Sequence, residues 1–288
     1  MRTTILITSN GLTASNGLIT SNGLTASNGL TASPDHWTAP GTELFQFPPI
    51  FPGGPEWLTK PVLIALLSAA IAIAVCWAAF AKPKIIPRGW QSIGEYAYEF
   101  VREQIAKPNL GKDSDRWMGF LFTVFLTVLI WNLMGVIPLI QFPVAAHVAF
   151  PLVLAVTVYV IKIYLGVRHH GVRGYLRGIV HLPGLPGWAY GLYAPMILAE
   201  VFITSLFTHF IRLFANMFAG HIIVAFFSSV GFWFLFERLT PLGAGLGVLG
   251  VAMTIVMTAL EILIQFLQAF LFAMLAGMFI ASGLRGSH

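Results

Sequence analysis

Long apolar runs alternate with short charged segments along this chain, and the runs have the lengths of membrane-spanning helices. A helix needs about 20 apolar residues to cross a hydrocarbon core about 30 Å thick. We predict three spans of ordinary length and then two much longer apolar segments, at 62–81, 117–137, about 144–161, about 190–236 and about 246–283. The two long segments must tilt strongly, bend or run partly along the membrane plane. Glycines at 243, 245, 247 and 250 predict a turn between them.

The composition indicates an integral membrane protein. Hydrophobic residues make up 57% of the chain, charged residues make up 9%, and the mean hydropathy is +0.81. Because the apolar runs are continuous rather than alternating, the pattern predicts an all-α bundle and argues against a transmembrane β-barrel. The single cysteine, Cys76, excludes an intramolecular disulfide and a cysteine-based metal site.

Basic residues predict the orientation of the chain in the membrane. They gather between the first and second spans and between the third and fourth: Lys82, Lys84, Arg88, Arg102, Lys107, Lys112, Arg116, Arg168, Arg173 and Arg177. Both loops should be cytoplasmic, which places the N-terminus outside and the C-terminus, with Arg285, inside. The net charge of +5 therefore reflects orientation rather than nucleic-acid binding. Residues 90–105 have the spacing of an amphipathic helix at the inner interface, and Lys162 is expected to snorkel from a helix end.

The first 44 residues differ in character from the rest. Asn-Gly-Leu recurs at Asn10, Asn16, Asn22 and Asn28 within a hexapeptide repeat. So few repeats would bury too little apolar surface for a β-helix, and Asn-Gly favours turns. We predict a low-complexity, disordered tail at 1–44 and one membrane helical domain at 45–288. A start codon assigned too early explains the repeat equally well.

Arg212 is the most unusual residue of the fourth apolar segment, which contains one other charged residue, Glu200. A charge at the centre of a bilayer costs from about 2.5 to more than 10 kcal/mol, so its presence indicates a function. At helical spacing Asn216 shares a face with Arg212, and His209 lies nearby. His221 lies about 180° round the helix and roughly 13 Å further along, so it faces the opposite direction.

The last segment carries a polar stripe at spacings of four, three, four and three: Thr254, Thr258, Glu261, Gln265 and Gln268. One interpretation is structural, with Arg212 and Glu261 as a buried salt bridge and the glutamines as interhelical hydrogen-bonding groups; for the glutamines it is favoured. It explains Arg212 less well, because small-residue packing joins two helices at lower cost. Imidazole and carboxyl groups at 221 and 261 are suited to moving protons.

These residues resemble a known family, the a subunit of F-type ATP synthase. The chain carries segments similar to its second-span signature, its arginine motif and its C-terminal proton-path motif, in that order: Asn132-Leu-Met-Gly-Val-Ile-Pro138, Arg212-Leu-Phe-Ala-Asn216-Met-Phe-Ala-Gly220-His221 and Glu261-Ile-Leu-Ile-Gln-Phe-Leu-Gln268-Ala-Phe. The resemblance covers about Phe45 to the C-terminus. It implies a stator subunit that carries protons past a rotating ring through two half-channels.

The resemblance also implies a role for each site residue. Arg212 matches the arginine that faces the ring carboxylates, and His221 and Glu261 match the polar pair of the entry half-channel. Asn216 and Gln268 match polar residues near the arginine. The family has an acidic residue upstream of the arginine, and Glu200 is assigned to this place on the exit path, although it lies closer to Arg212 than the family pattern.

The implied partners are a ring of c subunits, the b subunits and the rest of the F-type ATP synthase, within a lipid bilayer. The chain has no Gly-rich nucleotide loop of the Lys-Ser/Thr type, so we expect no catalytic site of its own, no cofactor and no metal. A bacterial plasma membrane is the expected location, with an organellar inner membrane as the alternative.

A stand-alone proton-coupled secondary transporter is the competing function, and a membrane scaffold is the third. Transporters commonly show internal repeats and interrupted helices around a midplane site. The two halves of this sequence show no convincing repeat. A scaffold leaves Arg212, His221 and Glu261 unexplained.

Overall fold

The computed structural model describes residues 37, 39–41, 59–81, 84, 89–137, 143–180, 189–237 and 240–285. Within these ranges the regular structure is helical, apart from an isolated bridge at Thr59. Five helical stretches of the described chain are long and apolar enough to cross a membrane. The predicted all-α membrane class is therefore confirmed. The repeat tail at 1–44 lies almost entirely outside the described residues.

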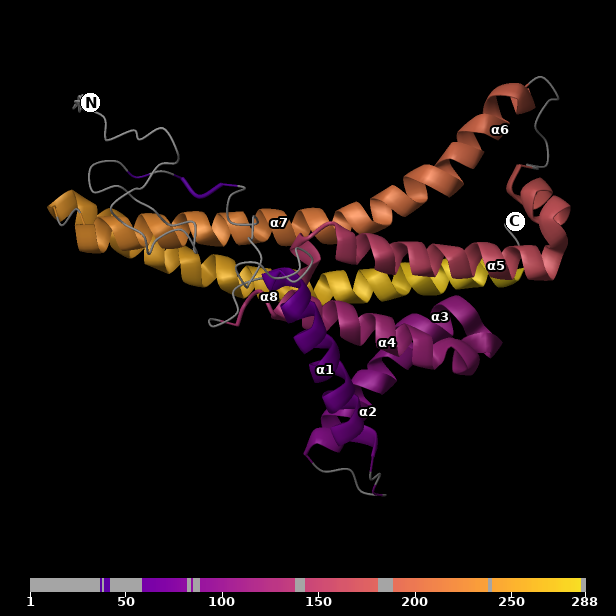
Figure 1. Ribbon diagram of the computed structural model, residues 1–288, viewed down its shortest axis with the longest axis horizontal. Helices are drawn as coiled ribbons and strands as arrows, with labels where there is room; N and C mark the ends of the chain where they lie inside the picture. The colour runs from indigo at the N-terminus through magenta and orange to yellow at the C-terminus, as the bar shows by residue number, and fades with distance from the viewer. Residues whose placement is uncertain are drawn as a thin grey trace, which may run out of the picture.

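Eight α-helices form the described part of the chain (Figure 1). Their bounds are α1 Lys60–Phe80, α2 Trp90–Val101, α3 Lys107–Leu110, α4 Ser114–Leu133, α5 Ala149–Val180, α6 Tyr190–Ala199, α7 Ser205–Phe232 and α8 Pro241–Arg285. Single π-helical turns join α2 to α3, join α6 to α7 and follow α7, at Arg102–Ala106, Glu200–Thr204 and Trp233–Glu237.

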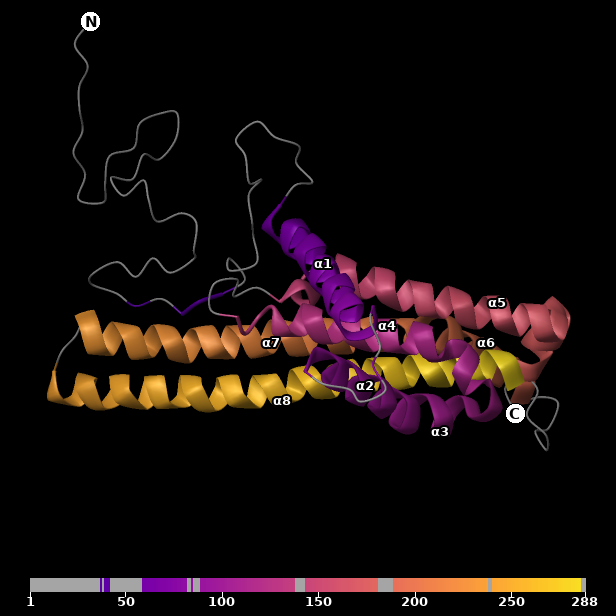
Figure 2. The ribbon, with the colours of Figure 1, turned by 90° about the horizontal axis from the view of Figure 1, so that it is seen from below.

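The last two apolar segments form a long antiparallel hairpin in which α7 and α8 lie side by side (Figures 1 and 2). Residues 190–237 make one 48-residue helical stretch, and α8 has 45 residues. At 1.5 Å per residue these are about 72 and about 68 Å long, more than twice the thickness of a hydrocarbon core. As predicted, both are too long for a perpendicular crossing. Figure 1 shows α6 turning away from the line of α7 at the π-helical turn.

The predicted glycine turn at 243–250 is wrong, because α8 begins at Pro241 and includes these residues. Thr240 caps the helix: its Oγ1 accepts a hydrogen bond of 3.0 Å from the backbone N–H of Gly243. Proline suits the first helical turn, where its missing N–H would have no partner. Gly247 and Gly250 serve packing instead. A Cβ on Gly250 would lie 2.7 Å from the backbone nitrogen of Gly231 on α7.

The basic segment expected as a loop between the first two spans is largely a second hairpin. The amphipathic helix predicted at 90–105 is present and continues to Leu110. The chain then reverses at Gly111, whose φ of 56° is readily adopted by glycine. Arg102 and Asp115 form an ion pair of 2.8 Å across this turn, and α4 packs back against α2. The second span therefore begins at Ser114.

The third span is longer than predicted and does not end at 161. α5 continues through the expected basic loop, with a sharp turn at Gly171, whose φ is 68°. The turn brings the ring of Tyr175 against Gly166, where a Cβ would clash with it. Lys162 consequently lies within the helix rather than near its end. Its side chain is buried, so the prediction that it snorkels is wrong.

The core forms where α4, α5 and α7 pack on the C-terminal half of α8. Phe125, Leu213, Met217 and Ile280 are among the fully buried side chains there. One polar contact crosses this core: Asn132 of α4 donates a hydrogen bond of 3.3 Å from Nδ2 to the backbone carbonyl of Gln265. Apolar packing around α8 thus fixes the face of α8 that is presented to α7.

Gly250→Ala should destabilise the hairpin, because the added methyl group would meet the backbone of Gly231. Overpacking of this kind costs about 1–3 kcal/mol. Gly245→Ala is the matched control, since nothing lies within 4 Å of its Cβ position and alanine is the better helix former. The measurement is the thermal stability of the detergent-solubilised full-length chain. Equal melting of the two variants would contradict this packing.

Candidate functional site

The centre of the candidate site is a close contact between α7 and α8. His221 of α7 and Glu261 of α8 approach to 3.8 Å between Nδ1 and Oε1. Glu261 is only 5% exposed, although its side chain is ionisable. Gly220 faces this carboxyl group, since a Cβ there would lie in van der Waals contact with Glu261, 3.4 Å from its Oε1. The sequence motif therefore places its glycine opposite the acid.

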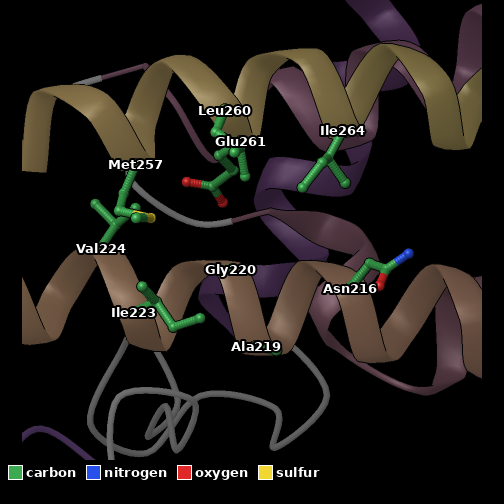
Figure 3. A pocket seen from close by; sticks show the side chains of 9 residues that line it. All are labelled: Asn216, Ala219, Gly220, Ile223, Val224, Met257, Leu260, Glu261 and Ile264. Atoms are coloured by element: carbon green, nitrogen blue, oxygen red, sulfur yellow. The ribbon is translucent and has the colours of Figure 1, made fainter. Parts of the chain in front are cut away.

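A cavity of about 170 Å³ lies beside this pair. Its polar lining residues are Asn216 and Glu261, and the others are small or apolar. Figure 3 shows the carboxyl group of Glu261 pointing from α8 toward α7, with Asn216 further along α7. The volume is ample for several water molecules, which need polar partners of this kind. The arrangement can hydrate the carboxyl group of Glu261 within an otherwise apolar hairpin.

Arg212 lies on the exposed side of α7, and small exposed residues, Ala215 and Ala219, follow it on that side. None of the ion pairs within the described ranges involves Arg212. The structural interpretation of a salt bridge between Arg212 and Glu261 is therefore not supported. His221 instead contacts α8, so the two residues face different ways, as the helical spacing predicts. The guanidinium is available to a partner outside this chain.

The predicted polar stripe of α8 is turned inward. Glu261, Gln265 and Gln268 are buried, and Thr254 and Thr258 are half-buried. The side-chain amide of Gln265 has no hydrogen-bond partner within the described structure, and neither does Oδ1 of Asn132. Unpaired buried amides are costly, so this part of the stripe favours hydration over a dry packing role.

Glu200 is not brought into this site. It is exposed, and it belongs to the π-helical turn that precedes α7, where the chain bends away from the hairpin. Its assignment to an exit path stays a prediction. Conversely, sequence reasoning did not single out Asn132 and Gly220 as site residues. Their position could have indicated a role in the site, because Asn132 lies in the second-span signature and Gly220 lies in the arginine motif.

The described residues contain no cluster of three or more His, Cys, Asp or Glu side chains that could hold a metal ion. The groups that the site does bring together are an imidazole, a carboxyl group and side-chain amides. Imidazole and carboxyl groups are the usual side chains of proton transfer, and amides can hold water between them by hydrogen bonds. Proton transfer is therefore the chemistry that this geometry supports.

Comparison with known proteins agrees with this chemistry. A model of the family described as ATP synthase A chain matches residues 62–281. ATP synthase subunit a of Streptomyces lividans is 34% identical over 259 residues, which cover 87% of this chain and 89% of that protein. The same subunit of Frankia alni is 36% identical, covering 87% of each chain. That of Pseudarthrobacter chlorophenolicus is also 36% identical, covering 87% of this chain and 95% of the relative.

The cavity should admit water, which cysteine labelling can test after the native Cys76 is replaced by alanine. We expect Asn216→Cys to react with a membrane-impermeant thiol reagent from the outer side, because thiols react as thiolates and so need water. Met217→Cys, fully buried on the same helix, and Ile255→Cys, on the exposed apolar face of α8, are the controls. An unreactive Asn216→Cys, or equal labelling of all three variants, would contradict a hydrated cavity.

Proposed function

The chain belongs to the ATP synthase A chain family. On that premise we propose that it is the proton-translocating stator subunit of the membrane sector of an F-type ATP synthase. It passes protons to and from a rotating ring of c subunits and so couples proton flow to ATP synthesis. One observation carries the mechanism: exposed Arg212 and His221, the partner of buried Glu261 on α8, lie on the same helix but face different ways.

Rotary proton transfer needs two aqueous half-channels that do not connect. A protonated ring carboxyl group can enter the lipid, whereas a charged one must stay paired. The cavity beside Glu261 supplies the entry half-channel. There, His221 and Glu261 exchange protons with water and deliver them to the ring, and Asn216 holds water on the path between this pair and Arg212.

Arg212 supplies the barrier between the half-channels. A guanidinium group keeps its proton, so it cannot relay one. It attracts each arriving ring carboxylate and stabilises the ionised form, which promotes release of the proton to the exit side. Its fixed positive charge also repels protons that would otherwise pass directly from one half-channel to the other. The exposure of Arg212 on α7 suits contact with a ring outside the chain.

The remaining assignments follow from the same proposal. ATP is made and hydrolysed in partner subunits, and the b subunits hold this chain against the ring. Gln268 lies near the level of Arg212 and supplies a buried polar group inside the hairpin there. Transport resides in residues 45–288, so the tail at 1–44 is not needed for it. The chain is a multi-pass protein of a bacterial membrane, and we place it in the plasma membrane.

Replacing Arg212 by alanine should abolish ATP-driven proton uptake into inverted membrane vesicles, because the ring carboxylate loses its counter-charge. Arg212→Lys should also impair uptake, since an ammonium lacks the planar fork and can lose its charge when buried. Arg168→Ala, which removes an exposed arginine of α5, is the matched control and should pump normally.

Assembly of the complex must be confirmed for each variant by co-purification with the c subunits. Normal pumping by an assembled Arg212→Ala complex would refute the proposed mechanism. A chain that transports protons without copurifying c subunits would instead support the secondary-transporter alternative.

A further inference from the structure

A second group of buried polar side chains lies where α5, α7 and α8 meet. His209 of α7 is 3% exposed, and its ring stacks on Phe272 of α8 with 3.9 Å between ring centroids. It also contacts Phe279 at 5.4 Å. Neither ring nitrogen has a hydrogen-bond partner within the described structure. Because a dry site would favour an apolar side chain here, the orphaned nitrogens indicate a bound polar species.

Lys162 of α5 belongs to the same group through Phe279. It is 8% exposed, and its Nζ lies 4.6 Å from the centre of the Phe279 ring and 5.2 Å from that of Tyr159. No ion pair within the described ranges involves it. The buried hydroxyl groups of Tyr159 and Tyr175 also lack hydrogen-bond partners there. Four side chains around one junction thus carry donors or acceptors that water would satisfy.

The two polar groups lie on opposite sides of Arg212. Along the hairpin His209 is level with Phe272, whereas His221 is level with Glu261. The two histidines are therefore about 18 Å apart along α7, and Arg212 lies about 4.5 Å from the level of His209. Fully buried Leu213 and Met217 occupy the helix between them. On α8, however, buried Gln265 and Gln268 lie between the levels of Glu261 and Phe272, so the separation of the two polar groups depends on the charge of Arg212.

We propose that His209, Lys162 and Tyr159 form the polar lining of the exit half-channel, with His209 as its proton relay. This inference rests on the proposed function. It concerns the end of the hairpin that the basic loops predict to be cytoplasmic.

The relay needs no other reactant. A ring carboxyl group that ionises beside Arg212 releases its proton to water, and one nitrogen of the neutral imidazole accepts it. The proton on the other nitrogen then leaves to water on the side of Tyr159 and Lys162. The gain of one proton and the loss of another leave the imidazole neutral, and it returns to its first tautomer before the next transfer. Lys162 and the tyrosine hydroxyl hold the water that receives the proton.

His209→Ala should lower ATP-driven proton uptake by roughly 10²-fold, the low end of what a positioned acid or base contributes, and added imidazole should restore part of it. Phe272→Ala removes the ring stacked on His209 and opens a comparable hole, so it controls for lost packing. Its defect should not respond to imidazole. Full pumping by His209→Ala, or equal imidazole rescue of both variants, would overturn the relay.

Side-specific labelling gives a readout that does not depend on pumping. With Cys76 replaced by alanine, His209→Cys should react with an impermeant thiol reagent in inverted vesicles, where the cytoplasmic side faces the medium, and not from the outer side. Leu213→Cys, fully buried one turn further along, should stay unlabelled. No labelling of His209→Cys from the cytoplasmic side would overturn the assignment.

Failure of this inference can be told apart from failure of the proposed function. If Arg212→Ala pumps normally, the transport mechanism itself is wrong. If Arg212→Ala is inactive while His209→Ala pumps normally and Glu200→Gln does not, the mechanism stands, the exit path runs past Glu200, and the assignment of His209 is refuted.

Discussion

The close packing of α7 on α8 is the contact on which the rest of the site depends. Gly231 and Gly250 leave room for the backbone of the facing helix to approach. In a bilayer such small residues allow the close van der Waals contact that drives helix association, since apolar side chains gain little by leaving lipid. The same closeness brings Glu261 within 3.8 Å of His221. One packing device therefore holds the hairpin together and assembles its polar pair.

The direction in which each polar side chain points follows from that packing. Because α4 and α5 cover the C-terminal half of α8, its polar stripe turns inward, where Asn132 reaches the backbone of Gln265. α7 contacts this assembly along one side only, which leaves Arg212 on the other. A charge so placed is stable only where water or a counter-charge reaches it. Arg212 therefore needs water or a negatively charged partner, and no acidic side chain within the described ranges pairs with it.

Much of this arrangement was predictable, for reasons that differ from residue to residue. Long apolar runs, the charge of Arg212 and the spacing of the α8 stripe depend on composition and helical periodicity, which the sequence displays directly. The role of the glycines at 243–250 and the burial of Lys162 cannot be predicted from composition or periodicity. In a sequence, a glycine of a turn cannot be distinguished from a glycine of a helix contact. A lysine at the end of an apolar run is expected to snorkel. The sequence does not show that the helix continues to a sharp turn at Gly171, which leaves Lys162 inside the protein.

The contrast between Arg212 and the two histidines explains why three different polar positions are needed on one helix. A relay must lose a proton as readily as it gains one, which imidazole does near neutral pH. A barrier must never lose its charge, because an instant of neutrality would let protons pass between the two sides, and only a guanidinium ensures this. In the proposed mechanism, the barrier lies between the levels of His209 and His221, which makes the direction of proton transfer depend on the motion of the ring. Without that motion, neither histidine could pass a proton to the other.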